Sequence, residues 1–256
     1  MSTNPADEVA AEMLVLMSPV FDTATHPRWR EAVKQTWLYL IRYYDIQSNS
    51  ETATSLVVSC NPVFAAPKPT QFKRIAQAVI HFEPVLDLFV PARAGTTVVT
   101  KRNWRDNPLL GNQTQAESIA LIEDIPIDNT RTDRHINIRG SPEAMVGAIM
   151  GHYNPWDPIR YNWYFKKHGE LDVITFGKGL VCERGEDVIR WSDFVLSFLR
   201  AAVSCPSPAR LQRIAMNRCG LQYFLSGQLG ITRRKLIQGV WWHVDIMSGQ
   251  RVVRQN

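Results

Sequence analysis

The chain has 256 residues, of which 45% are hydrophobic, and a formal net charge of +5. A chain of this length can bury the core of one domain, and no apolar run approaches the ~20 residues that span a bilayer. The basic residues are scattered along the sequence instead of forming a dense stripe, which argues against nucleic-acid binding.

The four cysteines are widely separated and form neither a CxxC pair nor a cluster with histidine. Free thiols in a reducing compartment are therefore expected, and zinc-ligand spacing is missing. The stretch MSTNPADEVAAEM has neither the basic nor the apolar region of a secretory signal. These features together predict a cytoplasmic protein.

The first half of the chain alternates short apolar runs with long amphipathic segments. Residues 1–10 are polar and small, and a disordered tail is expected there. Continuous apolar runs predict buried strands over 13–20 and 55–61. Helical spacing of apolar residues predicts helices over 28–44 and 71–89, the second with a kink at its internal proline.

His81 lies between apolar neighbours on the second of these predicted helices. A histidine in this position either packs in a helix interface or acts in catalysis, and the sequence leaves both interpretations open. Downstream, GTTVVTK (95–101) has strand composition. It is followed by the polar segment RNWRDNPLL and a short helix over 113–125.

The second half also alternates short apolar runs with amphipathic segments. It contains the most aromatic part of the chain, residues 151–167. The predicted elements are a short strand over 136–138, a helix starting at 141, strands over 160–165 and 172–176, helices over 183–203 and 208–228, and an edge strand within 236–246. The strands do not alternate regularly with the helices, so the pattern predicts an α+β fold instead of a doubly wound sheet.

Several ordered pieces resemble the fungal amidoligase-like proteins, which are ATP-dependent carboxylate–amine ligases related to glutamine synthetase and gamma-glutamylcysteine ligase. The pieces are LMSPV with PRWREAVKQTWLYL, then FKRIAQAVIHFEPVLDLFVP, KRNWRDNPLL with AESIALIE, and finally VITF with WSDFVLSFLRAA. The resemblance implies a curved antiparallel sheet with long helices packed around it. It also implies an amidoligase-like α+β domain over 11–205 and a C-terminal helical extension over 206–256 packed on the same domain.

The residues that would carry the ligase chemistry differ from the family pattern. The family's glutamate before Ser-Pro falls on Val15, its His-x-His strand on Leu56 and Val58, and the Glu-Phe-Arg of its closing strand on 175–177, which read Thr-Phe-Gly. Magnesium and a triphosphate require hard oxygen ligands and basic groups. The resemblance therefore implies a converted, more apolar cavity with no metal and no cofactor.

An apolar cavity of this kind would catalyse mainly by orienting its substrate and donating a few hydrogen bonds. The predicted function is a cofactor-independent cyclisation or isomerisation of an apolar small molecule, of the Diels–Alder type, in fungal secondary metabolism. Two alternatives stay open. One is a non-catalytic relic that binds a ligand or a partner, with the cavity filled by side chains, and the other is a residual ATP-dependent amide-forming ligase.

Candidate site residues come from the positions of the family's ligands and from the polar or aromatic residues of the neighbouring strands. The candidate catalytic residues are Lys101, Asn103, Arg105, Tyr161, Lys166 and Thr175, and the candidate substrate-binding residues are Val15, Leu56, Val58, Trp163, Tyr164 and Phe176. An exposed face or a salt bridge is the alternative interpretation for the charged residues, and ordinary core packing is the alternative for Trp163.

Overall fold

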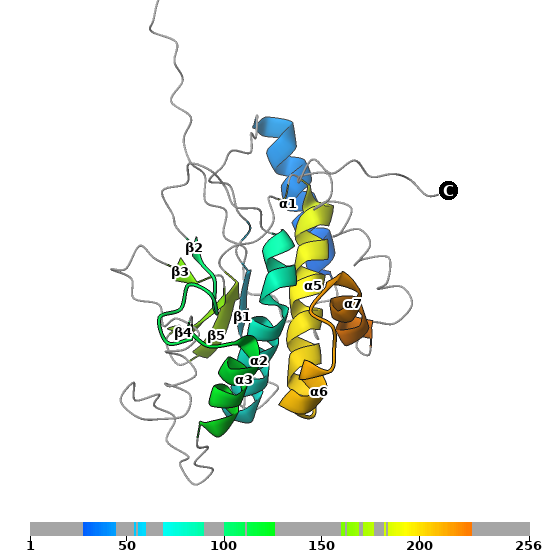
Figure 1. Ribbon diagram of the computed structural model, residues 1–256. Coiled ribbons are helices and arrows are strands. Elements are labelled where there is room, and N and C mark those ends of the chain that lie inside the picture. Colours follow the sequence, from blue (N-terminus) through cyan, green and yellow to red (C-terminus); the bar gives the residue numbers. More distant parts are fainter. Residues whose placement is uncertain are drawn as a thin grey trace, which may run out of the picture.

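The computed structural model describes residues 28–44, 54, 56–59, 69–89, 100–110, 112–125, 160–161, 163–168, 171–176, 182 and 184–226. Two long helices lie side by side at the centre of this part, α2 (Pro69–Leu86) and α5 (Gly185–Ser204), as Figure 1 shows. Both carry apolar residues at helical spacing, and these stripes are buried. Helix α2 continues through Pro84 and is followed by a 3₁₀ turn, η2 (Asp87–Phe89).

Helix α1 (Trp29–Tyr43) packs along α5. Two ion pairs join the helices, Arg30 with Asp193 at 2.6 Å and Lys34 with Glu186 at 2.8 Å. These pairs are largely exposed, so they orient α1 more than they stabilise the fold.

Helix α3 (Gln115–Asp124) packs on α2. Thr114 begins it with a capping box, in which its side chain accepts from the backbone of Glu117 and the Glu117 side chain accepts in return. The buried Lys73 of α2 donates from Nζ to the backbone carbonyls of Glu123 and Ile125 at the other end of α3. Side chains therefore satisfy terminal backbone groups at both ends of this short helix.

Two short helices, α6 (Pro208–Gln212) and α7 (Arg218–Ser226), close the other side of the helical layer. They contact α2, α3 and α5. The ring of His81 on α2 is buried, and its Nε2 lies 2.9 Å from the carbonyl oxygen of Ile214, in the turn between α6 and α7. Burial lowers the pKa of His81, so the neutral ring donates this hydrogen bond.

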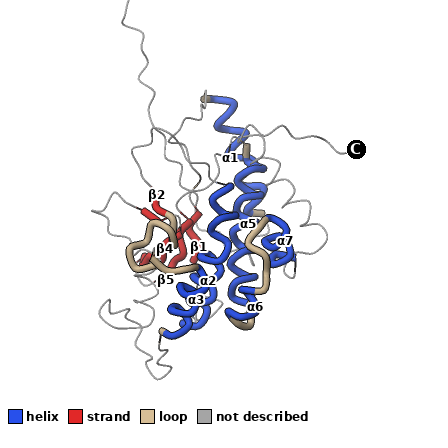
Figure 2. The backbone as a smooth tube through the Cα atoms, in the orientation of Figure 1, coloured by secondary structure: helices blue, strands red, loops and turns tan. Residues whose placement is uncertain are grey.

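A small sheet lies against the helices, as Figure 2 shows. Its order is β1 (Leu56–Ser59), β5 (Leu171–Phe176), β4 (Trp163–His168), all antiparallel. A separate parallel pair joins β2 (Thr100–Lys101) and β3 (Arg160–Tyr161).

The face of the sheet that meets the helices is aromatic. Leu56, Phe176 and Trp163 face one another across the three strands in register. The Trp163 ring lies 4.4 Å from that of Phe176 and 5.2 Å from that of Phe198 on α5. This cluster ties the sheet to α5, and its tilted ring geometry is the arrangement that aromatic pairs prefer.

The expected fold class is wrong for this chain. Most of the described residues are helical, and among them there is only a small three-stranded antiparallel sheet instead of a curved sheet with helices packed around it. The described strands have only two to six residues, so the apolar stripes of α2, α3 and α5 pack mainly on one another. No helix in the described ranges has the length and apolar character needed to cross a bilayer.

Some predicted elements lie outside the described residues. These are the tail over 1–10, the strands over 13–20 and 136–138, the helix starting at 141 and the edge strand within 236–246.

Candidate functional site

One face of α2 supplies the floor of a small site beside the sheet. Val79, Glu83 and Leu86 follow one another at helical spacing, so their side chains project from the same face, and Asp87 continues it into η2. The first three are buried, and Glu83 is only 4% exposed. A carboxyl group in this position needs partners, because an isolated buried charge is costly.

Those partners come from the loop that follows β2. The backbone N–H groups of Trp104 and Arg105 donate to the Glu83 carboxylate, with N···O distances of 2.6 and 3.2 Å. Burial raises the pKa of Glu83 to about 7, because the lowering effect of these two hydrogen bonds is smaller than the desolvation, and the nearby Asp87 and Asp106 add to the rise. Glu83 therefore populates both its acid and its base form near neutral pH.

The same loop holds the first residue of β4 through Asn103. Its side-chain amide donates to the carbonyl oxygen of Trp163 at 2.6 Å and accepts from the Trp163 backbone N–H at 3.0 Å. Asn103 is 1% exposed, so the pair of bonds is fully shielded from water. The amide thereby satisfies both backbone groups of Trp163, as a neighbouring strand would.

A salt bridge closes the outer side of the site. Arg102 Nε lies 2.9 Å from the Asp87 carboxylate, and both side chains are partly exposed. The contact joins η2 to the start of the loop, so the three successive loop residues 102, 103 and 104 are anchored to η2, β4 and α2 respectively.

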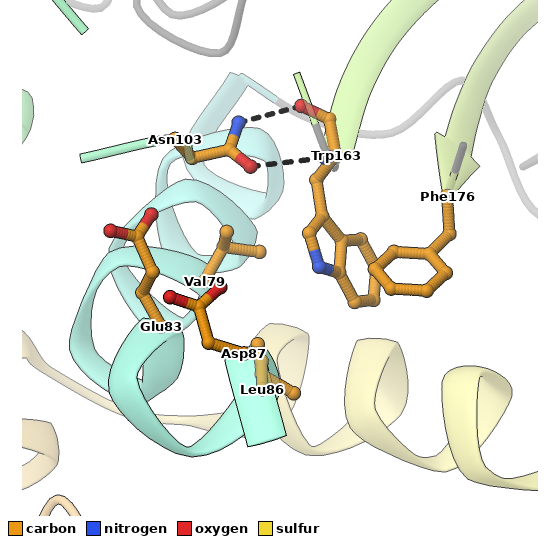
Figure 3. A pocket seen from close by; sticks show the side chains of 7 residues that line it. All are labelled: Val79, Glu83, Leu86, Asp87, Asn103, Trp163 and Phe176. Atoms are coloured by element: carbon orange, nitrogen blue, oxygen red, sulfur yellow. Dashed lines mark hydrogen bonds between the residues drawn. The ribbon is translucent and has the colours of Figure 1, made fainter. Parts of the chain in front are cut away.

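These groups surround a cavity, shown in Figure 3. Its lining residues are Val79, Glu83, Leu86, Asp87, Asn103, Trp163 and Phe176. The volume of the cavity is about 10 Å³, which is enough for about one water molecule. The indole nitrogen of Trp163 points toward Val79 and Asp87 and has no hydrogen-bond partner among the described residues. The cavity thus presents a carboxyl group and an unused N–H donor against an aromatic wall.

Three of the predicted site residues meet at this cavity, namely Asn103, Trp163 and Phe176. Leu56 and Val58 are partly buried and pack against the core from β1. Arg105 is exposed and lies over the Trp104 ring at 5.7 Å, so only its backbone takes part in the site. Val15 lies outside the described residues.

For five further candidates the structure describes the backbone alone. Lys101 pairs with Tyr161 between β2 and β3, Tyr164 pairs with Thr175, and Lys166 pairs with Val173. These pairings place the candidates on strands next to Asn103 or Trp163.

Sequence reasoning missed Glu83, the most chemically distinctive group of the site. A signal was present, because Glu83 interrupts the apolar stripe of α2 between Val79 and Leu86. A lone carboxylate on the buried face of a helix indicates either a buried hydrogen-bond acceptor or a functional group.

Comparison of the chain with protein-family models, curated proteins and solved structures finds no match. The resemblance to the amidoligase-like proteins therefore stays a prediction.

Replacing Asn103 with alanine should lower the free energy of unfolding by about 2 kcal/mol, because the backbone N–H and C=O of Trp163 lose their buried partner. Urea denaturation followed by tryptophan fluorescence measures this change. Asn112→Ala is the matched control, since Asn112 is exposed in the same loop and should cost little. Equal effects of the two substitutions would contradict the anchoring role of Asn103.

Proposed function

We propose that this chain binds an apolar small molecule at the Glu83 cavity and catalyses a cofactor-independent isomerisation or cyclisation. The observation that carries the proposal is the Glu83 carboxyl, which is buried beside an aromatic wall and has a pKa of about 7. A carboxyl group with this pKa is suited to transfer protons at neutral pH.

The simplest reaction that uses these groups is a proton shift in an unsaturated carbonyl compound. In an α,β-unsaturated carbonyl compound, ionised Glu83 would take a proton from the γ carbon, and the electron pair would move through the conjugated double bond onto the carbonyl oxygen. The Trp163 indole N–H would donate a hydrogen bond to that oxygen as its negative charge develops. Glu83 would then return the proton at another carbon, so no further reactant is consumed.

The size of the cavity favours a second candidate function. Room for about one water is too small for a terpenoid or polyketide, so catalysis requires the cavity to widen when a ligand binds. A non-catalytic relic would instead keep the cavity filled, with Trp163 and Phe176 acting as core residues. Such a chain would be an interaction module without turnover.

A thermal-shift experiment with a turnover assay separates these functions. The arms are ATP with magnesium, farnesoic acid, and farnesal, each with the wild-type chain. Stabilisation by farnesal or farnesoic acid follows from the proposal, because a ligand that binds only the folded state raises the melting temperature. Stabilisation by ATP with magnesium alone would overturn it and favour a ligase, and no stabilisation in any arm would favour the interaction module.

The role of Glu83 is tested with whichever ligand stabilises the chain. Chromatography follows the conversion of that ligand to an isomer. Glu83→Gln should lower the rate at least about 100-fold, because the amide cannot exchange the proton. Glu31→Gln is the matched control, since Glu31 is exposed on α1, and should leave the rate unchanged. Conversion at equal rates in both variants would show that Glu83 is not the proton-transferring group.

A further inference from the structure

A second, larger cleft lies on the side of the helical layer formed by α6, α7 and the turn between them. Its volume is about 740 Å³, within the range of small-molecule sites. None of its lining residues lines the Glu83 cavity, and none was a candidate in the sequence.

The turn that forms the floor of this cleft is held at several points. The Ile214 carbonyl accepts from the buried His81 ring of α2, and the Asn217 side chain accepts from the backbone N–H of Gly220 at 2.9 Å. Gly220 lies so close to Ala215 that a Cβ at this position would be 1.8 Å from the Ala215 carbonyl oxygen. These contacts fix the backbone that forms the concave surface of the cleft.

The charged residues that line the cleft are all basic. Arg210 and Arg213 lie one helical turn apart, both are exposed, and neither has a carboxylate partner among the described residues. The lining contains no aspartate or glutamate, and neither does the whole stretch 205–226. Paired guanidinium groups without a competing carboxylate bind carboxylates and phosphates.

An apolar surface accompanies the two arginines. Tyr223 of α7 is 66% exposed, and the partly buried Ile214 packs against the core from the floor of the cleft. An exposed tyrosine ring that lines the same cleft as two arginines provides a stacking surface for a flat apolar group. The combination is suited to a molecule with an anionic head and an aromatic or apolar body.

We propose that the α6–α7 cleft binds an organic carboxylate, whose charged group contacts Arg210 and Arg213 and whose apolar body packs on Tyr223 and Ile214. This site is independent of the Glu83 cavity and of its proposed reaction. It therefore stands whether or not that cavity is catalytic.

The test is calorimetric titration of the full chain with 1-naphthoate as the probe, with 1-naphthamide as its neutral counterpart and inorganic phosphate as the anion without an apolar body. Naphthoate should bind, and naphthamide and phosphate should each bind at least about tenfold more weakly, because each lacks one half of the recognised chemistry. Absence of naphthoate binding would overturn the proposal. Equal binding of naphthamide would remove the role of the arginines, and equal binding of phosphate would remove that of the apolar wall.

Variants locate the bound probe. The double substitution Arg210→Gln and Arg213→Gln should weaken naphthoate binding at least about tenfold, and both residues are exposed, so the variant should fold. The matched control is Arg42→Gln. Arg42 is an exposed arginine on α1, and α1 and α6 lie at opposite ends of α5, as Figure 1 shows. Unchanged binding in the double variant, or equal weakening in the control, would contradict the assignment.

A chemical readout places the probe independently of the variants. Cys219 is exposed and lines the cleft, whereas Cys182 is buried. Bound naphthoate should slow the modification of Cys219 by a maleimide, as followed by peptide mass spectrometry. Modification of Cys219 at the same rate with saturating naphthoate would mean that the probe binds elsewhere.

Discussion

Between pH 4.5 and pH 7, the wild-type chain should lose about 3 kcal/mol of unfolding free energy relative to its Glu83→Gln variant. The folded chain holds the Glu83 proton up to about pH 7, whereas the unfolded chain releases it near 4.5. In this window the unfolded state binds fewer protons, so stability falls as the pH rises. At about 1.4 kcal/mol for each pH unit, the interval between these two values corresponds to about 3 kcal/mol.

Urea denaturation of both proteins at a series of pH values measures this difference. The variant has a constant penalty of its own, because an amide accepts only one of the two backbone N–H groups at this position. That penalty does not depend on pH, so the change in the difference between the two proteins reports on Glu83. Parallel stability curves across the window would show that burial does not raise this pKa.

Replacing Gly220 with alanine should destabilise the chain by about 3 kcal/mol or more. The added Cβ would lie 1.8 Å from the carbonyl oxygen and 2.7 Å from the carbonyl carbon of Ala215. Both are backbone atoms, so relief requires α7 to move away from the α6–α7 turn. Thermal and urea denaturation measure the loss.

Gly185→Ala is the matched control, because Gly185 is also a helical glycine packed against a neighbouring helix. A Cβ there would lie 3.2 Å from the Trp37 Cβ and 3.3 Å from the Lys34 Cα, contacts that a shift of a few tenths of an ångström between α1 and α5 relieves. Alanine also favours helix over glycine by up to about 1 kcal/mol, so this substitution should change stability by less than about 1 kcal/mol. Similar losses at the two glycines would mean that the Ala215 contact does not determine the cost.

Helices α1, α2 and α5 are predictable from the sequence to within a few residues. The predicted helices over 28–44, 71–89 and 183–203 correspond to α1, α2 and α5, and the strand over 172–176 corresponds to β5. These elements are predictable because the period of apolar residues along a segment shows directly which of its faces is buried. Asn103, Trp163 and Phe176 are also predicted as site residues from the sequence, because each lies at or near a strand, and they meet at the cavity.

The way these elements combine follows from long-range contacts that the local sequence does not show. The size of the sheet depends on which apolar segments pair with one another. Leu56 pairs with Phe176, which is 120 positions away. Local composition therefore does not specify the strand pairing. Glu83 became a proton-transfer candidate only because the loop at 102–105 folds over α2, buries its carboxyl and supplies two N–H donors. The turn that forms the floor of the α6–α7 cleft is likewise held from a distant part of the chain, because the buried His81 ring of α2 bonds to the Ile214 carbonyl oxygen. Long-range packing thus sets the pKa of Glu83 and the shape of both cavities, because each depends on groups brought together from separate parts of the chain.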